Sequence, residues 1–396
     1  MQSPPRFLFS QEAPSPAYLL DTAGLCRNCA ILNTIQERTG VRILLALKAF
    51  AAWSLFPHLS RAFEGPLYGT CASSLDEARL GRELFGGEVH VFSAGYDEAS
   101  FQELLPLVDC VSFNSVAQFR RFAPLALAAK RPIHCGLRIN PEHSEGTVPL
   151  YDPCHPSSRL GVRARDFDMA LFAEGLSGLH CHTLCEQNAD ALDRTFKAVE
   201  ARFGEALGRC SWLNLGGGHH ITRTDYDREL LCSILLHAKR YGAELYLEPG
   251  EAVALDCGWL KATVLDVVTA DMPVVILNVS VTCHMPDVLE MPYRPHVFYE
   301  RAGRVCEAGE GADAGETVCR LAGNSCLAGD VIPFTYAFSE IPEVGSTLLF
   351  GDMAIYSMVK TTTFNGIRLP TIASFRDETV SIVRTFGYED FKSRLS

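Results

Sequence analysis

The chain has 396 residues, of which 47% are hydrophobic and 21% charged, an ordinary composition for a globular protein. Its 47 acidic residues outnumber its 35 basic ones, and no cluster of basic and aromatic residues is available to bind a nucleic-acid backbone. No apolar segment approaches the length needed to cross a bilayer, and the N-terminal segment lacks a secretory pattern. The 15 scattered cysteines indicate reduced thiols, so we expect a cytoplasmic protein without nucleic-acid or membrane partners.

Short apolar runs alternate with amphipathic segments of helix length along the first part of the chain. Segments 74–85 and 191–207 are typical of these helices. An alternation of strand and helix with eight strands predicts the α/β class and, within it, an eight-stranded β/α barrel. The strands are expected at 42–48, 66–73, 88–93, 110–115, 133–140, 175–182, 211–218 and 243–250.

After Pro249 the segments become β-rich and lose helical periodicity. We therefore expect a barrel over residues 22–255 and a C-terminal β-domain over 256–396, which the N-terminal residues 1–21 join through one strand. Segment 301–316 is rich in Gly, Ala and Glu and is expected to be a mobile surface loop. The strands of the β-domain are expected at 261–270, 273–281, 317–323, 346–352 and 368–375.

The polar residues that are unusual in such apolar strands gather at the C-terminal ends of the predicted barrel strands. In barrel enzymes this face carries the chemistry, because the C-terminal strand ends meet there. The residues are Lys48, Asn114, Arg138, His182, the run Gly216 to Gly218, and Glu248.

Lys48 directly follows a wholly apolar strand. A lysine at a strand end most often extends to solvent. The alternative is an amine held in an apolar pocket, where it forms a Schiff base. The convergence of the other strand ends on the same face favours the second interpretation.

Two further strand ends fit a phosphorylated ring. Glycines at 216–218 let backbone N–H groups approach a phosphate closely, although a tight strand-to-helix turn is the alternative. Glu248 ends an apolar strand, and a buried carboxylate needs a partner. A protonated pyridine nitrogen is one such partner, and backbone amides are the alternative.

His180, Cys181, His182 and Cys185 form a cluster that resembles a metal site. Strand alternation directs His180 and His182 to one face and Cys181 to the other, whereas zinc requires converging ligands. We therefore expect no metal. A flat imidazole at His182 suits stacking on an aromatic ring, and the complete set predicts pyridoxal 5′-phosphate bound through Lys48.

Motifs spread from about residue 16 to residue 369 resemble the alanine racemase and ornithine decarboxylase class of pyridoxal-phosphate enzymes, fold type III. Within this class they are most similar to the carboxynorspermidine (carboxyspermidine) decarboxylase family. The resemblance implies a pyridoxal-phosphate-dependent carboxy-lyase of polyamine (spermidine) biosynthesis. The motifs include LLALKAF, ASSLDEARLG, LRINPEHSE, GLHCHTLCEQN, LNLGGGHHIT, YLEPGEAVAL, TCHMPDVLEMPYRP, SCLAGD and MVKTTTFNG.

The resemblance also implies roles for individual barrel residues. Lys48 is implied to hold the cofactor as a Schiff base and His182 to stack on its ring. Glu248 is implied to pair with the ring nitrogen. The phosphate is implied to bind at Gly216, Gly217 and Gly218.

In the β-domain, the resemblance implies that Cys326 reprotonates the carbanion and that Tyr356 lies near the cofactor. Both residues are implied to come from the neighbouring subunit, so a homodimer with shared active sites is expected. The substrate is expected to be a small cationic amino acid that contacts Glu251, Asp287 and Asp330.

Two departures from the wider class bear on this substrate. Glu251 stands where ornithine and diaminopimelate decarboxylases carry an arginine that touches the phosphate. Leu327 stands where the ornithine enzyme has a substrate-binding aspartate, and Asp330 follows three residues later. We interpret Glu251 as a carboxylate that receives a substrate amine, because a carboxylate beside a phosphate is repulsive.

Two alternative functions stay open. A diaminopimelate decarboxylase is disfavoured because the distal carboxylate of its substrate would be repelled by Glu251. An inactive regulatory homologue is disfavoured because Lys48, His182, Glu248 and Cys326 are all present. The sequence leaves carboxynorspermidine and carboxyspermidine unresolved, since one methylene is worth only ~1–3 kcal/mol in a pocket.

Overall fold

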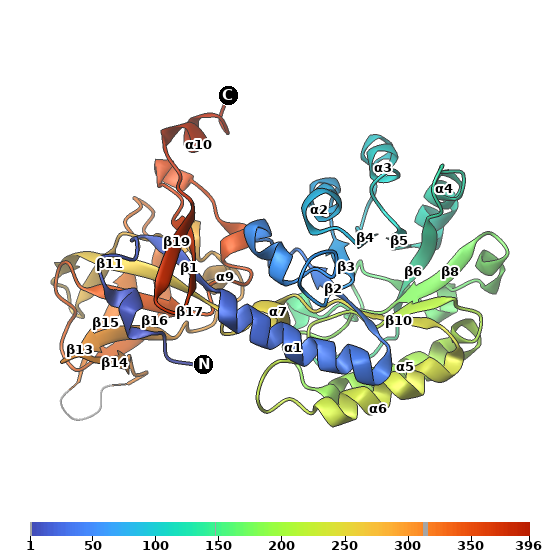
Figure 1. Ribbon diagram of the computed structural model, residues 1–396, viewed down its shortest axis with the longest axis horizontal. Helices are drawn as coiled ribbons and strands as arrows, with labels where there is room; N and C mark the ends of the chain where they lie inside the picture. Colours follow the sequence, from blue (N-terminus) through green and yellow to red (C-terminus); the bar gives the residue numbers. More distant parts are fainter. Residues whose placement is uncertain (1, 147, 312–315) are drawn as a thin grey trace. The chain divides into compact units, whose positions relative to one another are not determined.

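The computed structural model describes residues 2–146, 148–311 and 316–396. The chain forms two compact units, one made of residues 26–253 and the other of residues 1–25 together with 254–396. Figure 1 shows the first as strands surrounded by helices and the second as a predominantly β structure.

Eight parallel strands form a closed barrel in the unit 26–253. Each strand pairs with the next one in the chain, and the eighth strand, β10, pairs with the first, β2, to close the ring. The predicted β/α barrel and its eight strands are confirmed. The strands are β2 (Arg42–Ala46), β3 (Gly69–Ala72), β4 (Glu88–Phe92), β5 (Cys110–Phe113), β6 (His134–Asn140), β8 (Leu176–His180), β9 (Trp212–Asn214) and β10 (Glu244–Leu247), with a two-residue strand β7 (Val162–Arg163) beside β6.

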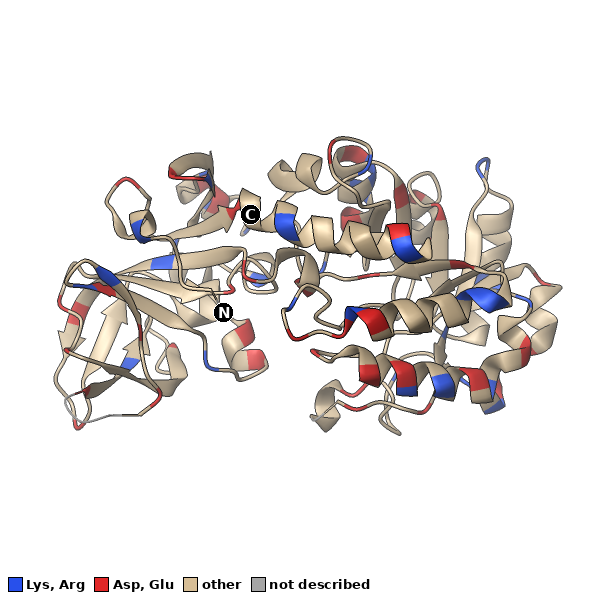
Figure 2. Ribbon diagram, turned by 60° about the horizontal axis from the view of Figure 1, so that its bottom comes forward, with Lys and Arg blue, Asp and Glu red and all other residues tan. Residues whose placement is uncertain are grey.

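Helices cover the outside of the barrel and begin at polar caps. Ser74, Asp97 and Ser115 each accept a hydrogen bond from a backbone N–H in the first turn of a helix. In this unit the charged residues lie mainly on the helices and connecting segments (Figure 2). The helices are α1 (Thr22–Thr39), α2 (Leu75–Leu80, continued by a π-helical turn Gly81–Phe85), α3 (Glu98–Leu104), α4 (Val116–Leu127), α5 (Ala189–Leu207), α6 (Arg228–Ala238) and α7 (Glu251–Ala254).

The second unit is built on a mixed sheet in the order β14-β13-β17-β11-β1-β18-β19, while β12 joins β11 to β15 and β15 pairs with β16. The N-terminal strand β1 lies between β11 and β18, so it joins this sheet as expected. The elements are β1 (Ala17–Asp21), β11 (Gly258–Val268), β12 (Val274–Leu277), β13 (Val297–Arg301), β14 (Arg304–Glu307), β15 (Thr317–Ala322), β16 (Val331–Phe338), β17 (Thr347–Gly351), β18 (Thr371–Arg376) and β19 (Thr379–Arg384), with α8 (Val281–His284), α9 (Asp287–Glu290) and α10 (Tyr388–Lys392).

Four of these strands, β13, β14, β16 and β19, were not predicted. The loop expected at 301–316 is wrong in its first part, because Arg304–Glu307 pairs with β13 as an antiparallel hairpin. Residues 312–315 of that segment lie outside the described residues. Within the described helices, none is long and apolar enough to span a membrane.

Candidate active site

The strand ends of the barrel place the predicted polar residues on one face. Each lies one to four residues beyond the C-terminal end of its strand, except Arg138, which lies inside β6. The residues are Lys48 after β2, Asn114 after β5, His182 after β8, Gly216 to Gly218 after β9 and Glu248 after β10.

A cavity of about 260 Å³ lies on this face and brings the predicted residues together. Lys48, Arg138, His182 and Glu248 line it, with Phe92 on one wall. Lys48 is exposed rather than buried, so the expectation of an amine enclosed in apolar surroundings is wrong for this unit. Buried Glu248 and partly buried His182 line the same cavity, and the role of Lys48 stays a prediction.

Glu248 is a buried carboxylate with a hydrogen bond to one oxygen and a histidine near the other. Asn214 Nδ2 donates to Oε1 at 2.6 Å, and Nε2 of His180 lies 3.2 Å from Oε2. Burial raises the pKa of Glu248, but the neighbouring side chains of His180 and Cys71 outweigh burial and leave this pKa well below its usual range. A fixed negative charge at this position matches a protonated ring nitrogen.

His182 is held neutral. Burial lowers its pKa well below the usual value, and the positive charges of Lys48 and Arg138 lower it further. The backbone N–H of Gly217 donates to Nδ1 at 2.9 Å, which leaves the proton of the neutral ring on Nε2. Arg138 donates to the backbone carbonyl oxygen of His182 at 2.8 Å, so the backbone of this residue is held as well as its ring.

The glycine loop packs tightly against its neighbours. Gly216 and Gly218 have φ values of +74° and +83°, which L side chains rarely adopt. A Cβ at Gly217 would lie 2.1 Å from the carbonyl oxygen of Glu248, and one at Gly218 would lie 1.9 Å from that of Leu184. The glycines are therefore required by the protein's own packing, a cause that the sequence interpretation missed.

Two of the three N–H groups of this loop are used within the protein, which leaves one for a phosphate. Gly216 N–H donates to Asn214 Oδ1 at 2.8 Å and Gly217 N–H to His182. Among the residues that the structure describes, none accepts the N–H of Gly218. The groups of this face match those of pyridoxal 5′-phosphate. They are the amine of Lys48, the neutral ring of His182, the carboxylate of Glu248 and the free N–H of Gly218. Across the described positions, no group of three or more His, Cys, Asp or Glu side chains is arranged to hold a metal ion.

Glu251 begins α7 and has a partner that the sequence did not reveal. Its Oε1 lies 3.2 Å from Nε2 of His220, in the segment that follows the glycine loop. The expected contact of Glu251 with substrate stays a prediction.

In the second unit, Cys326 lies in the connection between β15 and β16 and is exposed. Its backbone N–H donates to Asn365 Oδ1 at 3.1 Å. Asp330 is buried at 2% exposure, and its carboxylate accepts hydrogen bonds from Ser280 Oγ and from the N–H groups of Thr282 and Ser325. Asp330 therefore organises the connection that carries Cys326, and its substrate contact stays a prediction.

Asp287 and Tyr356 lie near one lysine of the same unit. Lys360 Nζ donates to Asp287 Oδ1 at 2.5 Å and to Glu290 Oε2 at 2.8 Å. The same ammonium lies 5.8 Å from the ring centroid of Tyr356, whose φ is +51°. Asp287 thus binds an ammonium group of its own chain, and its contact with substrate stays a prediction.

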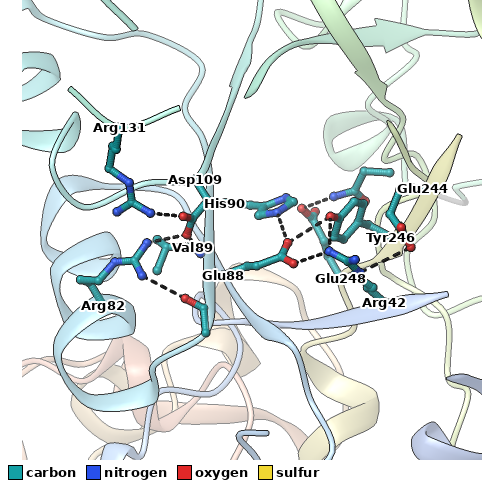
Figure 3. Close-up of polar contacts among 12 residues, drawn as sticks. Arg42, Arg82, Glu88, Val89, His90, Asp109, Arg131, Glu244, Tyr246 and Glu248 are labelled. Atoms are coloured by element: carbon teal, nitrogen blue, oxygen red, sulfur yellow. Dashed lines mark hydrogen bonds and ion pairs between the residues drawn. The ribbon is translucent and has the colours of Figure 1, made fainter. Parts of the chain in front are cut away.

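The barrel also carries a charged network at the N-terminal ends of its strands, which the sequence did not indicate. Glu88 accepts hydrogen bonds from Arg42 at 2.5 Å and from Tyr246 at 3.0 Å, with His90 3.1 Å away. Figure 3 shows these side chains directed toward one another, and a second cluster in which Arg82 and Arg131 bind Asp109. These charged side chains are paired with one another and lie at the opposite end of the strands from the predicted site. Both facts indicate a structural role.

Comparison with known families identifies the class of this protein. Residues 17–354 match the family described as pyridoxal-dependent decarboxylase, C-terminal sheet domain. The chain belongs to this family. The predicted decarboxylase activity is thereby confirmed, and the family's name implies the predicted cofactor.

Two curated relatives cover nearly the full length. The carboxyaminopropylagmatine decarboxylase of Synechocystis sp. is 42% identical, with 96% of this chain and 95% of that protein covered. The carboxynorspermidine/carboxyspermidine decarboxylase of Campylobacter jejuni is 38% identical, with 98% and 100% covered. The predicted resemblance to the latter family is confirmed.

Solved structures agree with the fold. The carboxynorspermidine decarboxylase of Campylobacter jejuni, solved in complex with norspermidine, matches with a TM-score of 0.84 at 36% identity, covering 96% of this chain and 99% of that one. The diaminopimelate decarboxylase of Helicobacter pylori matches with a TM-score of 0.80 at 17% identity, covering 96% of each chain. The second likeness shows the common fold alone.

Proposed function

We propose that this chain decarboxylates carboxynorspermidine, carboxyspermidine or both, with pyridoxal 5′-phosphate as cofactor. The observation that carries the proposal is the cavity in which Lys48, neutral His182 and anionic Glu248 meet, in a chain of the pyridoxal-dependent decarboxylase family. The names of the relatives from Campylobacter jejuni and Herminiimonas arsenicoxydans support the substrate.

The barrel residues have distinct tasks in this reaction. Pyridoxal phosphate supplies an electron sink for the electron pair released when CO₂ leaves. Lys48, which lines the cavity, would hold the cofactor through its amine. Glu248 keeps a proton on the ring nitrogen, because its low pKa makes it an anion at neutral pH. The imidazole of His182 supports the ring face without adding charge.

The remaining residues of the proposed site belong to the second unit. Cys326 is exposed and holds the proton that is delivered to the substrate's α-carbon. Tyr356 contributes to the cofactor pocket, and both residues act on the active site of the neighbouring subunit in a homodimer. The resemblance to the decarboxylase class supports this assignment. The same proposal places the protein in the cytoplasm. It assigns cofactor binding to the barrel of residues 22–255, and the dimer contribution to the β-domain of residues 1–21 and 256–396.

The substrate's distal end is a cation in each case. Asp287 is paired with the Nζ of Lys360, so its contact with a substrate ammonium requires that this pair open. A second candidate substrate is carboxyaminopropylagmatine, because the relative from Synechocystis sp. is named for that activity and is 42% identical. Its distal end is a guanidinium, which a carboxylate binds in a bidentate manner.

A direct assay separates these substrates. The purified protein is incubated with carboxynorspermidine, carboxyspermidine, carboxyaminopropylagmatine and diaminopimelate, and CO₂ and the amine product are followed. We expect kcat/KM for one of the first two to be highest. A higher value for carboxyaminopropylagmatine would make the second candidate correct. Cofactor binding without turnover of any compound would identify an inactive homologue.

The cofactor's attachment has its own test. Borohydride reduction of the holoenzyme should fix the cofactor to the peptide that contains Lys48, and Lys48→Ala should abolish both labelling and turnover. Lys130→Ala, a substitution outside the cavity, should leave both intact. Labelling elsewhere, or none after incubation with pyridoxal phosphate, would overturn the proposal.

A further inference from the structure

A buried histidine to which the proposed reaction gives no task stands beside the carboxylate of Glu248. His180 is the last residue of β8, and it is only 3% exposed. It lines the same cavity as Lys48, His182 and Glu248. A buried polar ring in the wall of this cavity calls for an account of what it does there.

The ring of His180 acts as a donor toward Glu248. Nε2 of His180 lies 3.2 Å from Oε2 of Glu248, while the other oxygen, Oε1, accepts from Asn214 at 2.6 Å. An ionised carboxylate only accepts hydrogen bonds. Nε2 must therefore carry a proton in this contact, whether the imidazole is neutral or charged.

The contact is close but is not yet an aligned hydrogen bond. Neither nitrogen of His180 has a hydrogen-bond partner among the residues that the structure describes. Hydrogen bonds of catalytic sites are often poorly aligned in the free enzyme and tighten when the ligand binds. Glu248 and His180 are thus placed to complete their bond as the site fills.

An aromatic contact supports the ring of His180 within the barrel. The ring of Phe92 meets it edge-on, with centroids 5.5 Å apart and planes at 73°. The guanidinium of Arg138 in turn lies 4.6 Å from the centroid of Phe92. Both supporting side chains line the cavity, so His180 is held by the wall of the site itself.

We propose that His180 is a positioning residue for the cofactor, which holds Oε2 of Glu248 so that the carboxylate faces the ring nitrogen. This inference rests on the proposed function, namely that the chain binds pyridoxal phosphate. Asn214 and His180 then hold the two oxygens of Glu248 separately, and the carboxylate cannot rotate away from the ring. Cys71, which also neighbours Glu248, offers only a thiol, a weak donor.

The test compares pyridoxal 5′-phosphate with its 1-deaza analogue, in which a C–H group replaces the ring nitrogen. Apoprotein is titrated with each compound, and each Kd is measured from the change in absorbance. His180→Phe keeps a flat ring and removes the donor. It should weaken binding of pyridoxal phosphate about 10-fold, as for loss of a hydrogen bond to a charged group, because Glu248 is then less well fixed and less stable as an anion. It should not weaken binding of the analogue.

Two further variants separate the donor from the shape of the side chain. The amide nitrogen of His180→Gln reaches the position of Nε2, whereas that of His180→Asn reaches only the position of Nδ1. The glutamine variant should therefore retain more affinity for pyridoxal phosphate than the asparagine variant. This comparison tests the proposal even where His180→Phe impairs folding.

The matched control is His90→Phe. His90 is another buried histidine of the barrel, and its Nε2 lies 3.1 Å from Oε2 of Glu88. This pair lies at the N-terminal ends of the strands, away from the cavity. The substitution should change the Kd of neither compound.

An unchanged Kd for pyridoxal phosphate in folded His180→Phe and His180→Asn proteins would overturn the proposal, as would equal affinities of the asparagine and glutamine variants. An equal loss for the 1-deaza analogue would also overturn it, since His180 would then act only on the shape of the site. A wild-type protein that binds neither compound would overturn the proposed function itself, and this inference with it.

Discussion

Asn214 and Glu248 are joined by a hydrogen bond of 2.6 Å in which the amide donates to the carboxylate. The carbonyl oxygen Oδ1 of the same side-chain amide accepts a hydrogen bond from the backbone N–H of Gly216 at 2.8 Å. One buried side chain thus connects the carboxylate of Glu248 with the glycine loop. A side-chain amide can satisfy both groups because its nitrogen donates and its oxygen accepts.

Asn214→Asp should therefore impair the site more than its small change in size suggests. Two adjacent buried carboxylates do not both ionise, so the charge of Glu248 would be partly lost. We expect cofactor affinity and kcat/KM to fall about 10- to 100-fold, as for loss of a hydrogen bond to a charged group. Titration of the apoprotein and steady-state kinetics measure this.

A matched control exists on the surface. Asn33 Nδ2 donates to Glu37 Oε1 at 2.8 Å on α1, so Asn33→Asp places two carboxylates together in solvent. It should have little effect, since solvent screens the repulsion. Full cofactor affinity in a folded Asn214→Asp protein would show that the bond to Glu248 is dispensable.

The role of Glu251 can be decided by measuring whether Glu251→Gln changes the Kd of pyridoxal phosphate or the KM of the substrate. If Glu251 positions His220, Glu251→Gln should weaken binding of pyridoxal phosphate and leave the substrate KM nearly unchanged at saturating cofactor. If it receives a substrate amine, as the sequence suggested, KM should rise about 10- to 100-fold at unchanged cofactor affinity. We expect the first result, because the carboxylate already lies 3.2 Å from His220.

Shared active sites predict complementation between inactive variants. Lys48→Ala and Cys326→Ala proteins should each be inactive as homodimers. When the two proteins are mixed and their subunits exchange, activity should return. One of the two sites in each heterodimer then combines intact Lys48 with intact Cys326. The activity of the mixture measures this, with exchange verified by a tag on one variant. Its absence would mean that one chain supplies the whole site.

Asp330→Asn should act on stability before it acts on substrate. The carboxylate accepts three hydrogen bonds, and an amide nitrogen would face at least one donor. We expect the free energy of unfolding to fall by about 1–3 kcal/mol, the typical effect of an unsatisfied buried group, as measured by denaturant titration. Asp377→Asn, on an exposed residue of the same unit, is the control. A raised KM at full stability would instead support the substrate contact.

The Glu88 network predicts a specific loss of stability in acid. Burial raises the pKa of Glu88, but His90, Arg42 and Tyr246 lower this pKa from 4.5 to about 2. A depressed folded-state pKa stabilises the fold above pH 4.5, and this contribution is lost as the pH falls from 4.5 to 2. Glu88→Gln should cost about 2 kcal/mol at pH 7, and the difference from wild type should shrink across that window.

Unfolding titrations from pH 7 to pH 3 measure this difference. Glu229→Gln serves as control, because the pair of Glu229 with Arg38 is exposed and contributes little. A difference that is constant with pH would show that the charge of Glu88 does not matter.

The barrel was predictable because its strands are buried and read as continuous apolar runs. Two of the missed strands are not continuous apolar runs. The strand β16 contains Pro333, which is tolerated because β16 is an edge strand. The strand β14 lies in a segment rich in Gly, Ala and Glu. For the site, Lys48, His182 and Glu248 could be located because each interrupts or ends an apolar strand. The pairing of His220 with Glu251, and the bonds of Asp330, could not, because the partners are distant in sequence and meet only through the fold.

Closure of the barrel has a consequence for how the chain folds during synthesis. The ring is completed when Tyr246 and Leu247 pair with Arg42 and Ile43, about two hundred residues earlier. Until β10 leaves the ribosome, β2 presents one unpaired edge, a state prone to wrong association. Such long-range closure is slow compared with helix formation. Chains truncated before β10 should therefore aggregate or bind chaperones, whereas chains truncated after α7 should form a closed ring.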